Sequence, residues 1–268
     1  MSIITLLTDF GNEDEYVGVM KGAILSINPS ARVVDITHAV NPQDLIQAAY
    51  LSESYFAYFP AGTIHVIVVD PGVGSKRSIL AAEISGHVFL APDNGVLTLL
   101  MEKGRIESIR CVEEPGYFLE TVSQTFHGRD IFAPVAAHIS KGVELNRFGA
   151  ARNINDLAHL PIPRPFISQA GELTGQIISI DHFGNLVTNI DRERIGKFFK
   201  TGAGRNLQII VGRSVIHGLN PCYGAVELQC PLAIINSRGY LEISVNGGSA
   251  KNYFMVEKKD VVTMRTSD

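Results

Sequence analysis

Strand-like apolar runs alternate with helix-like segments along the first half of the chain, and this alternation most constrains its fold. The runs IITLLTDF, ARVVDIT and TIHVIVVD are rich in Ile, Val and Leu throughout, which is typical of strands buried on both faces. Between them, residues 14–27 and 42–57 carry apolar side chains at helical spacing. This β-α-β-α-β order predicts an α/β domain with a mostly parallel central sheet, covered by helices on both faces.

Further elements of this half are predicted from the same signals. Asn41 and Pro42 should open the second helix, with Asn41 as N-cap and Pro42 in the first turn. HVFLAP is predicted to be a strand and VLTLLME a short helix, and residues 130–141, DIFAPVAAHISK, a longer helix. SILAAEIS is short and bounded by Gly86, so we expect a strand there.

The pattern changes after the proline-rich stretch LPIPRP at 160–165. From about residue 170 the chain consists of short apolar runs separated by turn residues, a pattern typical of a small antiparallel barrel or sandwich. DRERIGKFF is the one segment of this half that we expect to be helical. We therefore predict an α/β domain over 1–160, a linker over 161–169, and a smaller, barrel-like all-β domain over 170–268.

Composition limits the possible partners and surroundings of the protein. Of the 268 residues, 46% are apolar and 19% are charged, and the formal net charge is −4, so the chain is globular and lacks the basic surface of a nucleic-acid-binding protein. No apolar run is long enough to span a membrane, and Asp9 comes too early for a signal peptide. The three cysteines form no CxxC pair, so neither a disulfide framework nor a zinc ribbon is indicated. We expect a cytoplasmic protein without nucleic-acid or membrane partners.

The stretch VVDPGVGSKRS, residues 68–78, raises the question of a phosphate-binding loop. Its glycines lack the Walker A spacing, and a dinucleotide fingerprint needs a third glycine where Arg77 stands. A strand is expected after it, so no helix N-terminus supplies aligned N–H groups for a phosphate. We expect instead a tight turn across which Asp70 and Arg77 meet as an ion pair.

Two other stretches resemble protein-kinase signatures, TDFG at 8–11 and HGRD at 127–130. Their order is reversed, the spacing within HGRD is wrong, and the kinase glycine loop is missing. His127 and Asp130 have no further ligands at a recognisable spacing, so we predict no metal site.

Position within the predicted sheet favours a site built on acids. Asp9 and Asp70 each end an apolar strand, and parallel sheets bind ligands outside the carboxyl ends of their strands. A single acid at such a place can instead accept N–H groups of a turn, but two at equivalent ends favour a site. His127 lies in a glycine-adjacent loop just before a predicted helix, where an imidazole can act as a base.

Three polar turns stand out in the second half: DHFGNLVTN at 181–189, NSRGY at 236–240 and NGGSA at 246–250. Asn, Gly and Ser are ordinary turn residues, so each turn on its own is explained as a connection between strands.

Taken together, these stretches resemble the S-adenosyl-L-methionine (SAM) hydroxide adenosyltransferases, the SAM hydrolases related to fluorinase and chlorinase. Seven motifs carry the resemblance in the same order: LLTDFG, VVDPGVGSKR, APDNG, TFHGRDIFAP, IDHFGNLVTN, NSRGY and VNGGSA. The resemblance implies that water attacks the ribose C5′ of SAM and releases methionine and adenosine, with SAM as substrate and no cofactor. It implies a catalytic Asp-Arg-His triad, carried here by Asp70, Arg77 and His127. It also implies a homotrimer whose site lies between one subunit's α/β domain and a neighbour's β domain.

The resemblance also assigns binding roles to residues of both halves. It implies Asp9 for the ribose hydroxyls, Asp181 for the methionine ammonium, Ser237 and Arg238 for the carboxylate, Asn185 and the backbone near Gly247 for the adenine edge, and Tyr223 as a stacking face for the purine.

Three alternatives stay open at this point. The halogenating relatives have Tyr at the place matching Asp70 and an extra loop before the APDNG match, whereas AAEISGHVFLAP has no insertion. A carboxylate in a poorly solvated site would also repel a bound halide. A SAM- or adenosine-binding sensor with little turnover is the second alternative, and a sugar- or nucleotide-phosphate enzyme is the third, although the phosphate loop that it needs is missing.

Overall fold

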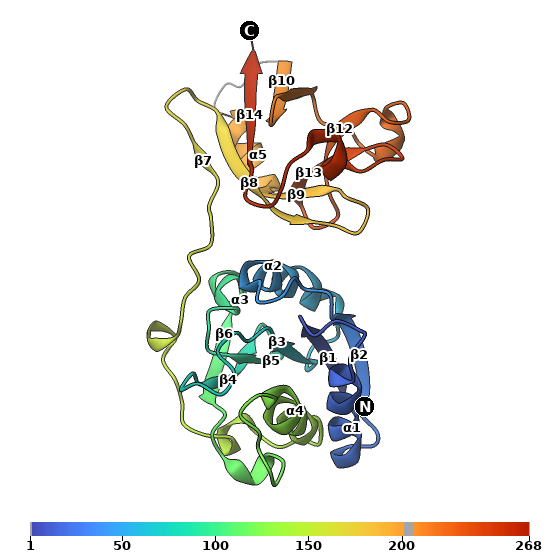
Figure 1. Ribbon diagram of the computed structural model, residues 1–268. Coiled ribbons are helices and arrows are strands. Elements are labelled where there is room, and N and C mark those ends of the chain that lie inside the picture. Colours follow the sequence, from blue (N-terminus) through green and yellow to red (C-terminus); the bar gives the residue numbers. More distant parts are fainter. Residues whose placement is uncertain (1, 201–205, 268) are drawn as a thin grey trace. The chain divides into compact units, whose positions relative to one another are not determined.

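The protein divides into two compact units, Met1–Pro161 and Ile162–Asp268. The computed structural model describes residues 2–200 and 206–267. In Figure 1 the first unit runs from blue to yellow-green and the second from yellow to red. We call them the α/β unit and the β unit and describe each by itself.

The α/β unit is built on a six-stranded sheet in the order β2-β1-β3-β5-β4-β6. Its strands are β1 Ile3–Thr8, β2 Arg32–Thr37, β3 Ile64–Val68, β4 Ile79–Ile84, β5 His87–Pro92 and β6 Ile106–Cys111. β2, β1, β3 and β5 are mutually parallel, as the apolar runs predicted. The sheet as a whole is mixed, because β4 is antiparallel to both β5 and β6.

A two-residue hairpin turn reverses the chain between β4 and β5. Ser85 and Gly86 both have positive φ, 52° and 76°, as a tight hairpin turn requires. The prediction of a mostly parallel sheet did not include this reversal, since Ser-Gly is a weak hairpin signal.

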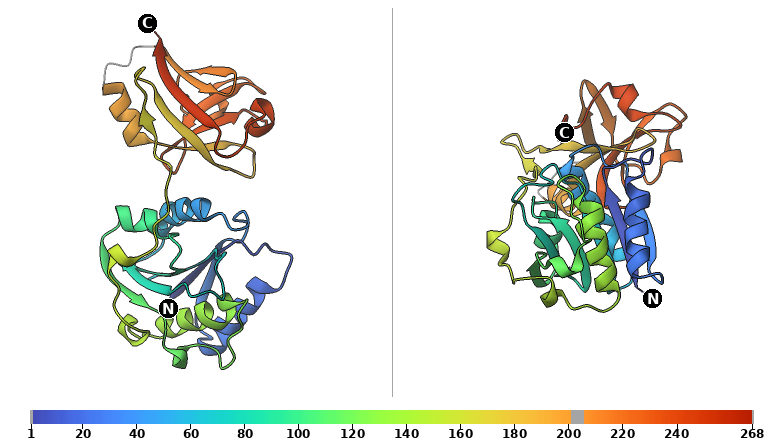
Figure 2. Two further views of the ribbon diagram at one scale, coloured as in Figure 1. Left: turned by 60° about the vertical axis from the view of Figure 1, so that its left-hand side comes forward. Right: turned by 60° about the horizontal axis from the view of Figure 1, so that its bottom comes forward.

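Helices cover both faces of the sheet, as Figures 1 and 2 show. They are α1 Tyr16–Ile27, α2 Leu45–Tyr55, α3 Thr98–Lys103 and α4 Ala133–Ser140. α1 and α4 pack on one face, and α2 and α3 on the other. Neighbouring residues of β1 join different cores: Leu6 packs with α1 and α4, and Leu7 with α2. Burial on both faces is therefore the reason for the continuous apolar runs.

Short helical turns complete this unit. Four are 3₁₀ helices, Phe56–Tyr58, Pro115–Tyr117, Leu145–Arg147 and Ile154–Asp156, and Gly128–Phe132 is a π-helix that continues into α4. Among the described residues, none of the helices has the length and apolar character needed to cross a membrane.

The start predicted for α2 is wrong. α2 begins at Leu45, and its N-cap is Asp44, whose carboxylate accepts a hydrogen bond from Gln47 N at 2.9 Å. The preceding Gln43 has a φ of 63°, a left-handed conformation that cannot be part of a right-handed helix. Asn41 and Pro42 therefore lie in the turn before the helix.

The order of the strands creates a switch point between β1 and β3. The chain leaves β1 through α1 to β2 on one side and returns through α2 to β3 on the other. Such a reversal opens a crevice at the carboxyl ends of the two central strands. Asp9 directly follows β1, and Asp70 follows β3 by two residues.

The β unit is a nearly closed antiparallel barrel, as its turn-separated strands predicted. Its elements are β7 Phe166–Ile167, β8 Leu173–Ile180, β9 Leu186–Asp191, α5 Arg192–Lys200, β10 Asn206–Val211, β11 Ser214–His217, the 3₁₀ helix Tyr223–Ala225, β12 Pro231–Ile235, β13 Tyr240–Val245, α6 Ala250–Phe254 and β14 Val261–Ser267. The strands follow the order β11-β10-β14-β8-β9-β13-β12, with β7 beside β8. The terminal strands β11 and β12 lie close to one another.

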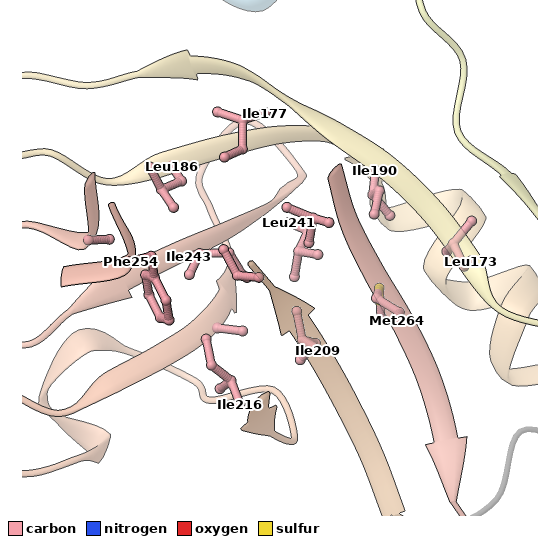
Figure 3. Packing of buried hydrophobic residues seen from close by; sticks show 14 of the residues in the cluster. Leu173, Ile177, Leu186, Ile190, Ile209, Ile216, Leu241, Ile243, Phe254 and Met264 are labelled. Atoms are coloured by element: carbon pink, nitrogen blue, oxygen red, sulfur yellow. The ribbon is translucent and has the colours of Figure 1, made fainter. Parts of the chain in front are cut away.

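One apolar core fills this barrel. Figure 3 shows Leu241 and Ile243 of β13 pointing into it, together with side chains of β8, β9, β10, β11 and β14 and Phe254 of α6. Because successive side chains of a strand alternate between its faces, Glu242 and Ser244 lie on the opposite face of β13. Both are nevertheless buried.

A neutral pair of histidines is buried in the α/β unit. His65 of β3 has its Nδ1 2.8 Å from Thr5 Oγ1 and its Nε2 3.1 Å from His87 Nδ1. The ring of His65 stacks on Phe89 and meets the edge of Tyr55. Burial, with a smaller effect of His87, lowers the pKa of His65 to about 3, so this pair is uncharged near neutral pH.

We predict that this pair makes the protein sensitive to acid. Below the ordinary histidine pKa of 6.5 the unfolded chain gains a proton that folded His65 refuses until about pH 3. The free energy of unfolding should therefore decrease as the pH is lowered from about 6.5 towards 3, by up to about 1.4 kcal/mol per pH unit. Urea unfolding at about pH 7.5 and about pH 5 should show a smaller loss for His65→Gln than for the unmodified protein. Equal losses would contradict the assignment.

Candidate functional site

A cavity of about 370 Å³ opens at the switch point of the α/β unit. Its polar lining includes Asp9, Asp70 and His127. Aromatic rings form another part of its wall: Phe10, Tyr16 and Phe126 meet with centroids 5.1–5.8 Å apart. The cavity therefore combines apolar walls with a few converging polar groups, as is usual in small-molecule sites.

Arg77 binds Asp70 and His127 at the same time. Its Nε donates to Asp70 Oδ1 at 3.0 Å and to Oδ2 at 2.8 Å, and its Nη2 also contacts Oδ2. The same Nη2 lies 2.9 Å from His127 Nδ1. The ion pair expected across this turn is thus present. The side chains of Asp70 and Arg77 are only 4% and 10% exposed, so the pair is shielded from water.

The contact with Arg77 sets the protonation of His127. A guanidinium has only donors, so Nδ1 of His127 must accept, and the proton of the neutral ring lies on Nε2. Burial lowers the pKa of His127, and the charge of Arg77 lowers it further, whereas Asp70 and Asp130 act in the opposite direction. His127 is therefore a neutral imidazole that offers an N–H donor at Nε2.

The glycine loop packs directly on the segment before His127. Gly74 has a φ of 76°, and a Cβ there would collide with the carbonyl oxygen of Gln124. Only glycine allows both the conformation and the close approach. The loop ends at β4 and not at a helix, which agrees with the argument against a phosphate loop.

Two residues that the sequence analysis did not single out hold the acids in place. Asn94 of the APDNG turn donates its amide to Val69 O at 2.9 Å, which fixes the chain just before Asp70. The backbone N–H of Gln43 donates to Asp9 Oδ2 at 2.8 Å. Gln43 does so from its left-handed conformation, a strain that often marks functional sites. The APDNG motif was a signal for Asn94, but nothing in the sequence pointed to Gln43.

Asp130 supports the loop that leads to His127. It is fully buried and accepts from Ser123 N at 2.8 Å and from Arg129 Nε at 2.6 Å. Burial and these partners act in opposite directions on its pKa, which is lowered overall. Within the described ranges, no three His, Cys, Asp or Glu side chains gather as metal ligands.

The β unit has a cavity of its own, of about 570 Å³. Four of the predicted binding residues line it: Asp181, Asn185, Tyr223 and Gly247. Asp181 accepts from the backbone and the amide of Asn185, at 2.8 and 2.9 Å. A Cβ at Gly184 would collide with Ser249 Oγ, so the turn at 181–185 packs tightly on the N-cap of α6.

Ser237 and Arg238 lie elsewhere in the β unit. They occupy the turn between β12 and β13, where Asn236 Oδ1 accepts from Arg238 N at 3.0 Å and from Tyr240 N at 3.1 Å. The cavity adjoins Val245, at the other end of β13. The structure therefore does not bring these two residues into the cavity lining, and their binding role stays a prediction.

A buried carboxylate lies between the turn and the cavity. Glu242 accepts from Tyr223 OH at 2.8 Å, from Asn236 Nδ2 at 3.0 Å and from Ser244 Oγ at 3.0 Å. Sequence reasoning missed it, because an acid between two inward-pointing apolar residues of a strand indicates an exposed position.

Comparison with known proteins matches both units to domains of the same protein family. Residues 4–149 match the SAM hydroxide adenosyltransferase N-terminal domain, and residues 175–263 match the corresponding C-terminal domain. The chain is 36% identical to the (R)-S-adenosyl-L-methionine hydrolase of Thermus thermophilus, over 94% of each chain. It is 33% identical to the hydrolase of the same name from Methanocaldococcus jannaschii, over 98% of this chain and 95% of that one.

The chain is also similar to a fluorinase and to a solved structure. A fluorinase from an Actinoplanes species is 30% identical over 91% of each chain. The crystal structure of an uncharacterized conserved protein from Thermotoga maritima superposes with a TM-score of 0.90 at 35% identity, covering 98% of this chain and 99% of that one.

Because Asp70 and His127 share the Arg77 guanidinium, we predict that two substitutions have opposite effects on the pKa of His127. Because Arg77 lowers the pKa of His127 and Asp70 raises it, Arg77→Gln should raise this pKa and Asp70→Asn should lower it. NMR titration of the His127 ring in each variant measures both shifts. If both variants moved the pKa in the same direction, the proposed geometry would be wrong.

Proposed function

The chain belongs to the SAM hydroxide adenosyltransferase family, and we propose that it hydrolyses SAM to adenosine and L-methionine. The observation that carries the proposal is the Asp70–Arg77–His127 cluster at the wall of a cavity that also contains Asp9. These are the residues that the family resemblance assigns to activation of water and to binding of the ribose.

The reaction is a displacement at the ribose C5′. The oxygen of water forms a bond to C5′ while the C5′–S bond breaks. The electron pair of the C5′–S bond stays on sulfur, which leaves as the neutral thioether of methionine. Sulfonium is already a good leaving group, so the enzyme's task is to hold one water in line with that bond. Fixing reactants in this way removes much of the entropic cost of the reaction.

The tautomer of His127 suggests how the two polar side chains divide the work. His127 donates its Nε2–H to the oxygen of the water, and Asp70 is the acceptor for a water proton. The water becomes strongly acidic as its oxygen bonds to carbon, so even a carboxylate paired with Arg77 suffices. Proton transfer to a positioned group typically contributes about 10²–10⁴-fold.

The binding roles follow the family pattern. Asp9 accepts the ribose hydroxyls from the position that Gln43 N fixes. In the β unit, Asn185, Tyr223 and the backbone near Gly247 receive the adenine, and Asp181 the methionine ammonium. Ser237 and Arg238 receive the carboxylate.

We also propose that the active site forms between subunits of a homotrimer. Each unit has its own cavity with its own share of the predicted residues, as expected if the α/β unit of one subunit meets the β unit of another. The free cysteines, Cys111, Cys222 and Cys230, suit a reducing compartment, and we place the reaction in the cytoplasm.

Incubation with SAM tests the reaction. The protein should release adenosine and methionine in equal amounts, measured by liquid chromatography, and Asp70→Asn should lower kcat by about 10²–10⁴-fold because the proton acceptor is lost. Glu83→Gln is the matched control, since Glu83 lies in the same unit and lines a different cavity. Absence of both products would refute the proposal, and tight adenosine binding without turnover would favour a sensor.

Mixing two inactive variants tests the site between subunits. Asp70→Asn disables the α/β half of a site and Arg238→Ala the β half, so random co-assembly should restore about one quarter of the sites. Steady-state kinetics of the co-expressed pair measures this against each variant expressed alone. If every site lay within one chain, the mixture would show no more than the average of the two parents.

A further inference from the structure

Glu242 is a buried acid of the β unit that contacts Tyr223, one of the predicted SAM-binding residues. Its neighbours Leu241 and Ile243 point into the barrel core, so its own side chain lies on the other face of β13. It is still only 4% exposed. An acid held out of water at this depth needs hydrogen-bond donors around it to be tolerated.

Three donors from separate parts of the unit meet this carboxylate. Tyr223 comes from the 3₁₀ helix Tyr223–Ala225, Asn236 from the turn after β12, and Ser244 from β13 itself. The orientation of the Asn236 side chain is fixed, because its amide oxygen Oδ1 already accepts hydrogen bonds from two backbone N–H groups, those of Arg238 and Tyr240. Its amide nitrogen must therefore point at Glu242.

These contacts tie together two regions that have different roles in binding. The Tyr223 side chain lines the cavity and the residue is 46% exposed, while its hydroxyl is held on Glu242. Burial, Glu242 and Asp181 raise the pKa of Tyr223 to about 12, so the phenol remains a donor. Asn236 opens the turn that carries Ser237 and Arg238. One carboxylate thus orients both the purine-stacking ring and the carboxylate-binding turn.

We propose that Glu242 is a positioning residue for substrate binding, which holds Tyr223 and the Asn236 turn in one fixed geometry. The inference rests on the proposed function for the identity of the ligand. Both carboxylate oxygens are engaged by protein donors, so Glu242 acts through these side chains and not by touching the substrate. Its loss should affect binding more than the chemical step.

Two substitutions separate position from charge. In Glu242→Gln the amide oxygen can accept from Asn236, while the amide nitrogen donates to the hydroxyls of Tyr223 and Ser244, which are able to accept. Glu242→Ala removes all three hydrogen bonds. We expect Glu242→Ala to raise the KM for SAM about tenfold with kcat within about threefold, and Glu242→Gln to stay within about threefold of the unmodified protein in both.

The controls keep this test decisive. Glu83→Gln removes one negative charge outside the two candidate binding cavities and should change neither kcat nor KM. Thermal unfolding verifies that each variant is folded; if Glu242→Ala is not, Tyr223→Phe and Asn236→Ala remove the two contacts singly, and each should raise KM. An unchanged KM in the folded alanine variant, or in both single variants, would overturn the proposal. So would a glutamine variant as impaired as the alanine variant.

Adenosine binding separates this proposal from the proposed function. Calorimetry measures the Kd for adenosine without any turnover, and we expect Glu242→Ala to weaken it about tenfold while Glu242→Gln retains it. If the unmodified protein released no adenosine from SAM but showed this pattern, hydrolysis would be refuted and the role of Glu242 upheld. An adenosine affinity that is the same in all variants would refute the role of Glu242.

Discussion

One guanidinium organises the candidate active site of the α/β unit. Arg77 joins the end of β3, through Asp70, to the start of the π-helix that continues into α4, through His127. Because arginine neither accepts hydrogen bonds nor loses its proton, this one residue sets the distance between the two groups, the tautomer of the imidazole and the charge of its surroundings. The glycine at 74, the Asn94 amide and buried Asp130 keep the connected segments in place.

Much of the fold could be predicted from the sequence because burial leaves a clear periodic signal. Strands covered on both faces must be apolar throughout, and the first half shows such runs. Local backbone choices left no comparable signal. The reversal at Ser85 and the left-handed Gln43 depend on the surrounding structure, and they account for the mixed sheet and for the later start of α2.

The residues of the candidate sites also differ in how much of their role the sequence reveals. Asp70 and Arg77 are seven residues apart across a turn, so their ion pair could be expected from local sequence alone. His127 lies 50 residues from Arg77, so only the family resemblance brings the two together from the sequence, and the structure places His127 at the start of a π-helix and not in the predicted loop. Glu242 finds Tyr223 at a separation of 19 residues and lies on a strand face that usually meets solvent. Only the folded barrel shows that this face is covered.

The pairing of Asp70 with Arg77 also determines the charge at this part of the cavity wall. Together the two side chains carry no net charge, because the carboxylate of Asp70 offsets the positive charge that would otherwise attract an anion. A mutation that removes this carboxylate leaves a guanidinium that is only 10% exposed and has lost its counter-ion, and such a cation attracts an anion from solution. A single substitution at position 70 can thus turn a neutral ion pair beside the cavity into a positively charged site.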